Sequence, residues 1–114
     1  MSGWERVVEQ LGEPSPVEVS AELERGLNDH QRRALQALVD AGDTGLNDFE
    51  LAAVTGIAQT SIGVRRGELA GRFLVEQPGV KRPSSSGSPS TVWYATRLGR
   101  AVERALALGV WGGL

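Results

Sequence analysis

The order of patterns over residues 46–96 constrains the fold more than any other feature of this chain. Residues 51–57, Leu-Ala-Ala-Val-Thr-Gly-Ile, have the composition of a short amphipathic helix that ends at a glycine turn. A second helical pattern follows over residues 59–70. Two short β-prone segments, 73–77 and 91–96, then flank a loop rich in Ser, Gly and Pro. We therefore expect a mainly α protein with a small antiparallel β-hairpin (α+β).

Capping residues locate the other helices of this region. Two capping boxes, Asn-x-x-Gln at Asn28 and Asn-x-x-Glu at Asn47, predict helices over residues 29–41 and 48–55. Apolar residues at helical spacing predict a final helix over about residues 98–108, at Leu98, Val102, Ala105 and Leu106.

The N-terminal part of the chain has its own helical pattern. Ser2 with Glu5 fits a capping box, and the helix it begins ends before the Pro-Ser-Pro of residues 14–16. Residues 17–27 are ambiguous, with Ser20 as the candidate cap of a short helix. We therefore divide the chain into an N-terminal helical arm, a main domain and an apolar C-terminal tail, at residues 1–26, 27–109 and 110–114.

The composition argues against several classes of function. The chain has no cysteine and one histidine, His30, so we expect no metal and no cofactor. Asp40, Asp43 and Asp48 stand near predicted helix ends, where helix electrostatics accounts for them. The N-terminus lacks a signal-peptide pattern, and no apolar run approaches the ~20 residues that cross a bilayer. We expect a cytoplasmic protein that is not an enzyme and has no membrane partner.

Charge is unevenly distributed along the chain. The net charge is −2, and residues 1–26 hold six acidic and two basic side chains. Residues 51–100 hold only Glu68 and Glu76 against seven basic side chains. A locally basic surface attracts phosphates even when the whole chain is acidic, so the second half of the chain favours an anionic partner.

The second predicted helix carries small residues on and beside its outer face, opposite the apolar positions Ile62 and Leu69. Gly63, Gly67 and Gly71 recur every four residues, and each costs about 1 kcal/mol relative to alanine in a helix interior. Glycine allows close approach of the backbone to another surface. A DNA groove and a partner helix both fit this pattern, and neutral drift on an exposed face is a third interpretation.

Arg65 and Arg66 lie closer to the core side of this helix than to its outer face. We expect one of them to pair with a carboxylate such as Glu50 or Glu68, and the other to reach a phosphate at a groove edge. A solvated face is the alternative interpretation of the pair.

The predicted hairpin has a basic, serine-rich tip. Lys81 and Arg82 stand beside several serines in the loop 79–89, and charges and hydroxyls of this kind suit phosphates or the minor groove. A solvated, mobile loop is the alternative. In the returning strand, Trp93 is predicted to face the core and Tyr94 to face outward.

Residues 46–96 resemble the winged helix-turn-helix domains of small regulators related to the multiple-antibiotic-resistance repressors, and of compact DNA-binding proteins of actinobacteria and their phages. The resemblance is carried by Asp48–Ala52, Gly56–Ile62, Arg65–Leu69, Leu74–Val75 and Ser86–Trp93. It implies a second helix in the major groove and a wing on flanking DNA. Two positions depart from the family pattern: Phe73 replaces the usual glycine, and Ala58 replaces a polar cap.

The leading hypothesis is a sequence-preferring double-stranded-DNA-binding protein, a small transcriptional or phage and mobile-element regulator. Its recognition helix would be residues 59–70 and its wing residues 78–90. The candidate DNA contacts are Gln59, Thr60, Ser61, Gly63, Val64, Arg65, Arg66, Lys81, Arg82, Ser84 and Ser85. The alternative is a winged-helix protein-interaction module that docks a partner through the face of Gly63, Gly67 and Gly71.

We also expect a homodimer, built from apolar surfaces at the two ends of the chain. These surfaces comprise Trp4, Val7, Val8 and Leu11 at one end and Leu106, Val110 and Trp111 at the other. In the alternative arrangement, the two surfaces cover each other within one chain.

Overall fold

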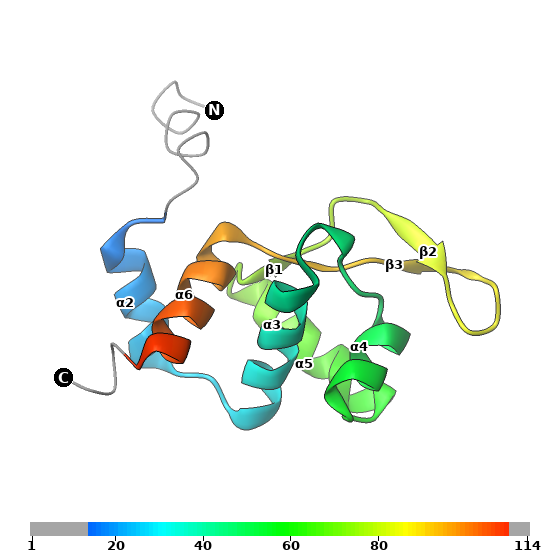
Figure 1. Ribbon diagram of the computed structural model, residues 1–114, viewed down its shortest axis with the longest axis horizontal. Helices are drawn as coiled ribbons and strands as arrows, with labels where there is room; N and C mark the ends of the chain where they lie inside the picture. The colour runs from blue at the N-terminus through cyan, green and yellow to red at the C-terminus, as the bar shows by residue number, and fades with distance from the viewer. Residues whose placement is uncertain (1–13, 110–114) are drawn as a thin grey trace, which may run out of the picture.

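The computed structural model describes residues 14–109, and helices form most of this part of the chain (Figure 1). The helices are α2 (Pro16–Arg25), α3 (Asp29–Ala41), α4 (Asp48–Thr55), α5 (Gln59–Gly71) and α6 (Arg97–Leu108), with a 3-10 turn, η1 (Gly42–Thr44). The strands are β1 (Val75–Glu76), β2 (Lys81–Pro83), β3 (Pro89–Thr91) and β4 (Tyr94–Ala95). This architecture confirms the predicted fold class. The helix predicted after Ser2 and the tail 110–114 lie outside the described residues.

The start of α2 differs from the prediction. The Ser15 hydroxyl accepts a hydrogen bond from the backbone N–H of Glu18, whose carboxylate accepts one from the backbone N–H of Ser15. Pro16 is therefore the first residue of α2, a position where proline's missing N–H leaves no bond unmade. Ser20, the predicted cap, lies inside the helix. The other two capping boxes begin α3 and α4 at the predicted residues.

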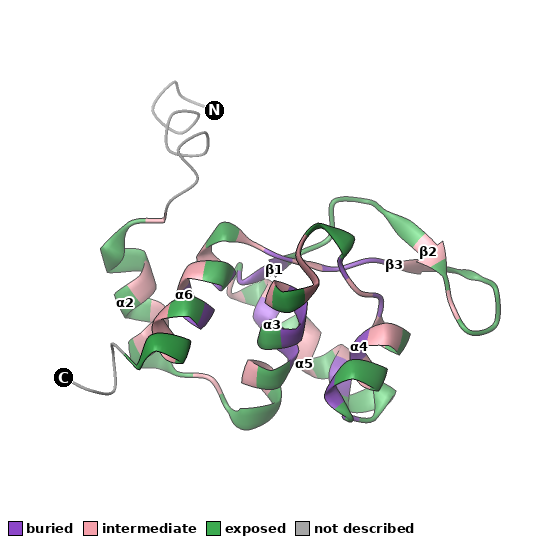
Figure 2. Cartoon of the chain, viewed as in Figure 1, coloured by how far each residue is buried: buried purple, intermediate pink, exposed green. Residues whose placement is uncertain are grey.

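The hydrophobic core is centred on α3, which contacts α4, α5, α6 and β4 (Figure 2). Helix α2 packs on α6, with Val19 and Leu23 partly buried against the core. Trp93 is buried, as predicted, whereas Tyr94 is half-buried and not fully exposed. Burying a Leu, Ile or Val side chain contributes roughly 1.5–3 kcal/mol. The fully buried side chains of this kind are Leu35, Leu38, Leu51, Ile62, Leu69, Leu74, Val92 and Val102.

The predicted hairpin consists of two short antiparallel ladders. β1 pairs with β4, which places Val75 opposite Ala95, and β2 pairs with β3, which places Lys81 opposite Thr91. Leu46 adds an isolated antiparallel bridge to Trp93. The ladders together form a wing that is longer than the paired segments predicted from the sequence.

The wing tip is shorter than the loop predicted over residues 79–89, because that stretch contains β2 and the first residue of β3. Pro83 and Pro89 lie opposite each other at the outer end of this ladder. Proline has no N–H to donate, so ladder pairing stops there. Only residues 84–88 form the tip, which is closed by hydrogen bonds from the Ser84 N–H to the Ser88 carbonyl and from the Gly87 N–H to the Ser84 carbonyl.

The turn after α5 keeps a left-handed geometry although phenylalanine replaces the usual glycine. Phe73 has φ 61°, and its N–H donates to the Ala70 carbonyl. The Leu74 N–H donates to the Leu69 carbonyl, which completes a Schellman motif. Phe73 therefore adopts the left-handed conformation that glycine adopts easily, at a conformational cost of roughly 1–2 kcal/mol.

Candidate nucleic-acid interface

A cleft of about 360 Å³ lies between the helix pair, α4 and α5, and the wing. The structure brings three of the predicted site residues, Gln59, Arg66 and Ser84, to its walls. In Figure 1 the β2–β3 ladder projects beyond α4. The other residues that line the cleft were not predicted as site residues: Asp48, Phe49, Gln77, Ser90, Thr91 and Trp93.

The outer face of α5 is open and uncharged. Gln59, Thr60 and Ser61 are exposed, and Val64 is 52% exposed. A Cβ atom added at Gly67 or Gly71 would meet no other atom within 4 Å, and one at Gly63 would make only ordinary contacts at 3.6 Å. Ala58, at the N-cap of α5, provides no side-chain hydrogen bond, as the sequence predicted. Another surface can therefore approach the backbone of this helix closely.

Arg65 pairs with Glu68 within α5. Its Nη1 lies 3.2 Å from Oε1 of Glu68, and the same oxygen accepts a hydrogen bond of 3.0 Å from Nε2 of Gln31. The expectation that one arginine of the pair contacts Glu68 is confirmed. Arg65 does not line the cleft. The bond between Gln31 and Glu68 joins α5 to the start of α3.

Arg66 joins three elements at the wall of the cleft. Its Nε and Nη2 donate to Oδ1 and Oδ2 of Asp48, at 3.1 and 2.7 Å. Its guanidinium carbon lies 4.4 Å from the centroid of the Trp93 ring. Asp48, which the sequence explained by helix electrostatics alone, is thus the paired acceptor of an arginine on the next helix.

Arg82 is held at the base of the wing by four hydrogen bonds. Its Nε and Nη2 donate to Oε1 of Glu50 at 3.2 and 2.7 Å, and it also donates to the carbonyls of Thr44 and Gly45. Burial disfavours the charged form of Glu50 and by itself would raise the pKa of this carboxyl. The bonds from Arg82 and from the Asn47 N–H outweigh that effect, and they hold the pKa of Glu50 below its usual value. These contacts fix the wing to α4.

Asn47 adds a second connection between α4 and the wing. It is 1% exposed, and its Oδ1 accepts the capping bond from the Glu50 N–H. Its Nδ2 donates to the Ser90 hydroxyl at 2.9 Å, and that hydroxyl donates to the Arg82 carbonyl at 2.7 Å. The residue that begins α4 therefore also sets the position of β3.

The rest of the wing faces solvent. Lys81 is exposed, and its Nζ donates to Oγ1 of Thr91 at 2.8 Å. At the tip, the hydroxyls of Ser84 and Ser86 lie 3.0 Å apart, and Ser85 is exposed. Lys81 and the serine hydroxyls are groups that rotate toward a ligand at little cost.

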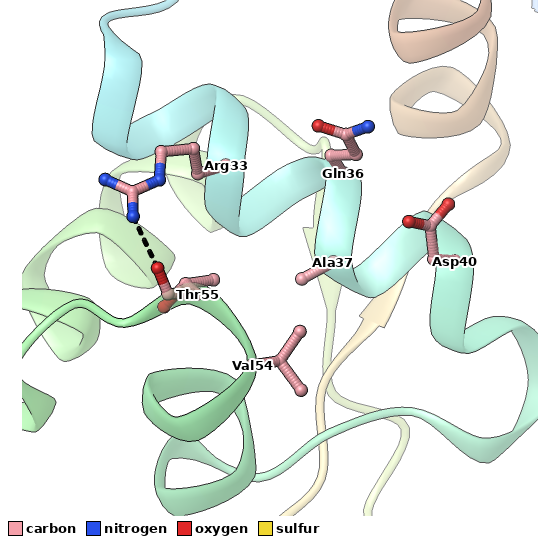
Figure 3. Close-up of a pocket in the computed structure, with 6 residues that line it drawn as sticks. All are labelled: Arg33, Gln36, Ala37, Asp40, Val54 and Thr55. Carbon is pink, nitrogen blue, oxygen red and sulfur yellow. Dashed lines mark hydrogen bonds between the residues drawn. The ribbon is translucent and has the colours of Figure 1, made fainter.

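A second hollow, of about 220 Å³, lies between α3 and α4 (Figure 3). Arg33 points across it and donates to the Thr55 carbonyl, at the end of α4, while Asp40 lies at its other end. Arg33 also pairs with Asp29 at 3.4 Å. These contacts satisfy a helix-end carbonyl. The hollow contains none of the predicted site residues.

No three or more His, Asp or Glu side chains within residues 14–109 are grouped so that they would hold a metal ion. No helix in the same range is long and apolar enough to span a membrane.

Comparison with known proteins supports the fold. No protein-family model matches the chain, and no curated protein matches its sequence. Among solved structures, a MepR–DNA complex from S. aureus matches with a TM-score of 0.62 and 13% identity, over 98% of this chain and 86% of that chain. RV1404 from Mycobacterium tuberculosis matches with a TM-score of 0.56 and 16% identity, over 96% of this chain and 72% of that chain. At these identities the likeness concerns the fold, and at that level it confirms the resemblance to winged helix-turn-helix domains.

Proposed function

We propose that this protein binds double-stranded DNA as a small cytoplasmic regulator, of transcription or of a phage or mobile element. Helix α5 would enter the major groove, and the wing, residues 78–90, would contact flanking DNA. The observation that carries this proposal is one cleft bounded by both the start of α5 and the serine-tipped wing. The fold shared with a protein solved as a DNA complex supports it.

The outer face of α5 offers specific chemistry to base edges. Gln59 suits the N6 and N7 atoms of adenine, whereas Thr60 and Val64 suit thymine methyl groups. Ser61 would bond to either a base or a phosphate. Few long side chains are available for bidentate base contacts, so sequence discrimination would be modest and would depend partly on DNA shape.

Contacts to the DNA backbone would come mainly from Lys81 and the tip of the wing. Lys81, Ser84 and Ser85 provide one charge and two hydroxyls. The other predicted contacts, Arg65, Arg66 and Arg82, each have a carboxylate partner within 3.2 Å. The number of phosphates neutralised by each chain would therefore be small.

A protein-interaction function is the second candidate, and the neutral face of α5 favours it. Val64 is about half exposed, and Gly67 and Gly71 leave open space above the helix. A partner helix would pack against such a face without ionic contacts. Binding of this kind would resist salt, whereas binding to phosphates weakens as salt rises.

A charge placed on this face tests the proposal. Gly67→Glu adds a carboxylate where there is open space, so the fold should tolerate it, and DNA should be repelled. Ser20→Glu adds the same charge at an exposed position of α2 and serves as the matched control. We expect Gly67→Glu to weaken binding to random duplex DNA at least about ten-fold, or 1.4 kcal/mol. Equal affinities of the two variants would remove α5 from the interface.

We also propose a homodimer through the two ends of the chain. Leu106 is half-buried against the core, and Leu108 is 69% exposed. The other residues predicted for this interface, Trp4, Val7, Val8, Leu11, Val110 and Trp111, lie outside the described residues. Light scattering at micromolar concentration should give the mass of two chains, and a monomer mass at every concentration would exclude the dimer.

A further inference from the structure

Two ion pairs of similar length begin at the first turn of α4, and they differ in what else holds each arginine. Nη2 of Arg66 lies 2.7 Å from Asp48, and Nη2 of Arg82 lies 2.7 Å from Glu50. Arg82 has two backbone carbonyls as further acceptors, those of Thr44 and Gly45. Within residues 14–109, Asp48 is the one hydrogen-bond acceptor of the Arg66 guanidinium, which otherwise lies over the Trp93 ring. Arg66 is therefore the more easily released of the two.

The two arginines also differ in position. Arg66 and Asp48 both line the cleft between the helix pair and the wing, and their side chains are 24% and 28% exposed. Arg82 and Glu50 are not among the residues of that cleft. A ligand in the cleft would thus meet the first ion pair and not the second.

The chemistry of the first pair matches that of a phosphate contact. A guanidinium presents the same two-pronged set of donors to a carboxylate and to a phosphate. Two phosphate oxygens would fit where Oδ1 and Oδ2 of Asp48 now accept. Such an exchange would leave the Arg66 guanidinium over Trp93, so it requires no rearrangement of the core.

We infer that Asp48 competes within the molecule for the position of a DNA phosphate at Arg66, and so limits the affinity of the protein for DNA. This inference rests on the proposed function, because it concerns the cleft that would hold the DNA backbone. Glu50 has the different role of anchoring the wing through Arg82. The helix start thus contains one carboxylate that regulates binding and one that positions the wing.

Asp48→Asn and Glu50→Gln test this assignment as a matched pair, since each removes one negative charge from the same helical turn. Asp48→Asn should tighten binding to random duplex DNA about two- to five-fold, the range expected for release of a partly exposed ion pair. It should also steepen the plot of log affinity against log salt by up to about 0.9, the value for one additional phosphate. Glu50→Gln should give no increase in affinity or slope, and it should lower the melting temperature.

The outcomes separate the inference from the proposed function. Wild-type protein that does not bind duplex DNA even at low salt (about 50 mM) would overturn both. Wild-type binding with an unchanged affinity and slope for Asp48→Asn would overturn the inference alone, as would an equal gain in Glu50→Gln. If Asp48→Asn fails to fold, Asp48→Ser provides the same test, because serine is small and polar and also removes the carboxylate.

Discussion

At the scale of single residues, glycine has two opposite roles in this chain. A Cβ atom on Gly99 would collide with the Leu74 carbonyl oxygen and lie 3.2 Å from Cδ1 of Leu35, whereas one on Gly67 would meet nothing. Gly99→Ala should therefore destabilise the fold by roughly 1–3 kcal/mol through overpacking. Gly67→Ala should stabilise it by about 1 kcal/mol through helix propensity. Denaturant unfolding of both variants would measure these changes, and shifts of the same sign would contradict this account.

Phe73 provides a second prediction at this scale. The residue is 76% exposed and has a left-handed backbone, so its side chain contributes little packing while its conformation is costly. Phe73→Gly should raise the free energy of unfolding by about 1 kcal/mol, because glycine adopts this conformation without the Cβ clash. Phe73→Ala is the control, since it removes the ring and keeps the Cβ atom. An equal gain in both variants would show that the backbone conformation is not the cause.

Glu103 is buried on α6, and its Oε2 has no hydrogen-bond partner within the described part of the chain. Arg32 Nε lies 3.6 Å away. Burial raises the pKa of Glu103, Arg32 partly opposes this effect, and the charge of Asp40 adds to it. The folded state therefore holds this proton more tightly than the unfolded state does. The resulting stability is complete below the ordinary glutamate pKa and is lost as pH rises through the raised one.

Glu103→Gln should remove that pH dependence and raise the stability at pH 7 by about 1 kcal/mol, since an amide is less costly to bury than a carboxylate. Thermal unfolding of wild type and variant from pH 4 to pH 8 would measure the difference. Parallel pH curves for the two proteins would contradict the prediction.

At the scale of elements, the helix caps show what the sequence predicts well and what it misses. The capping boxes at Asn28 and Asn47 involve residues three positions apart, so the starts of α3 and α4 could be predicted from the sequence alone. The bond from Asn47 to Ser90 spans 43 residues, and no local pattern indicates it. The extent of the wing ladders was not fully predicted, because it too depends on residues that are not neighbours in the sequence. Their ends depend on Pro83 and Pro89 lying opposite each other.

These two caps provide a matched prediction. Asn28→Ala removes an exposed cap and should cost about 0.5–1 kcal/mol, near the low end for N-caps. Asn47→Ala removes a buried cap and also leaves the Ser90 hydroxyl without its donor, so it should cost about 2 kcal/mol or more. Equal losses of stability in the two variants would show that the bond to the wing contributes nothing.

At the scale of the whole molecule, folding pairs three of the basic side chains with carboxylates and so reduces the free positive charge. The sequence indicated a strongly basic second half. The structure pairs Arg65 with Glu68, Arg66 with Asp48 and Arg82 with Glu50. Two of these pairs join residues 18 and 32 positions apart, which is why composition alone overestimated the free positive charge. The helix-turn-helix, the wing and the Arg65–Glu68 pair were predictable, whereas the pairing of Arg66 with Asp48 and of Arg82 with Glu50 was not.

The salt dependence of DNA binding tests this account most directly. With Lys81 unpaired by any carboxylate in the described residues and Arg66 available by exchange, one chain would neutralise about one or two phosphates. A titration of random duplex DNA should therefore give measurable binding at low salt. The slope of log affinity against log salt should lie between about −1 and −2 for each bound chain. A slope steeper than about −5 for each chain, or no binding at any salt concentration, would contradict the account.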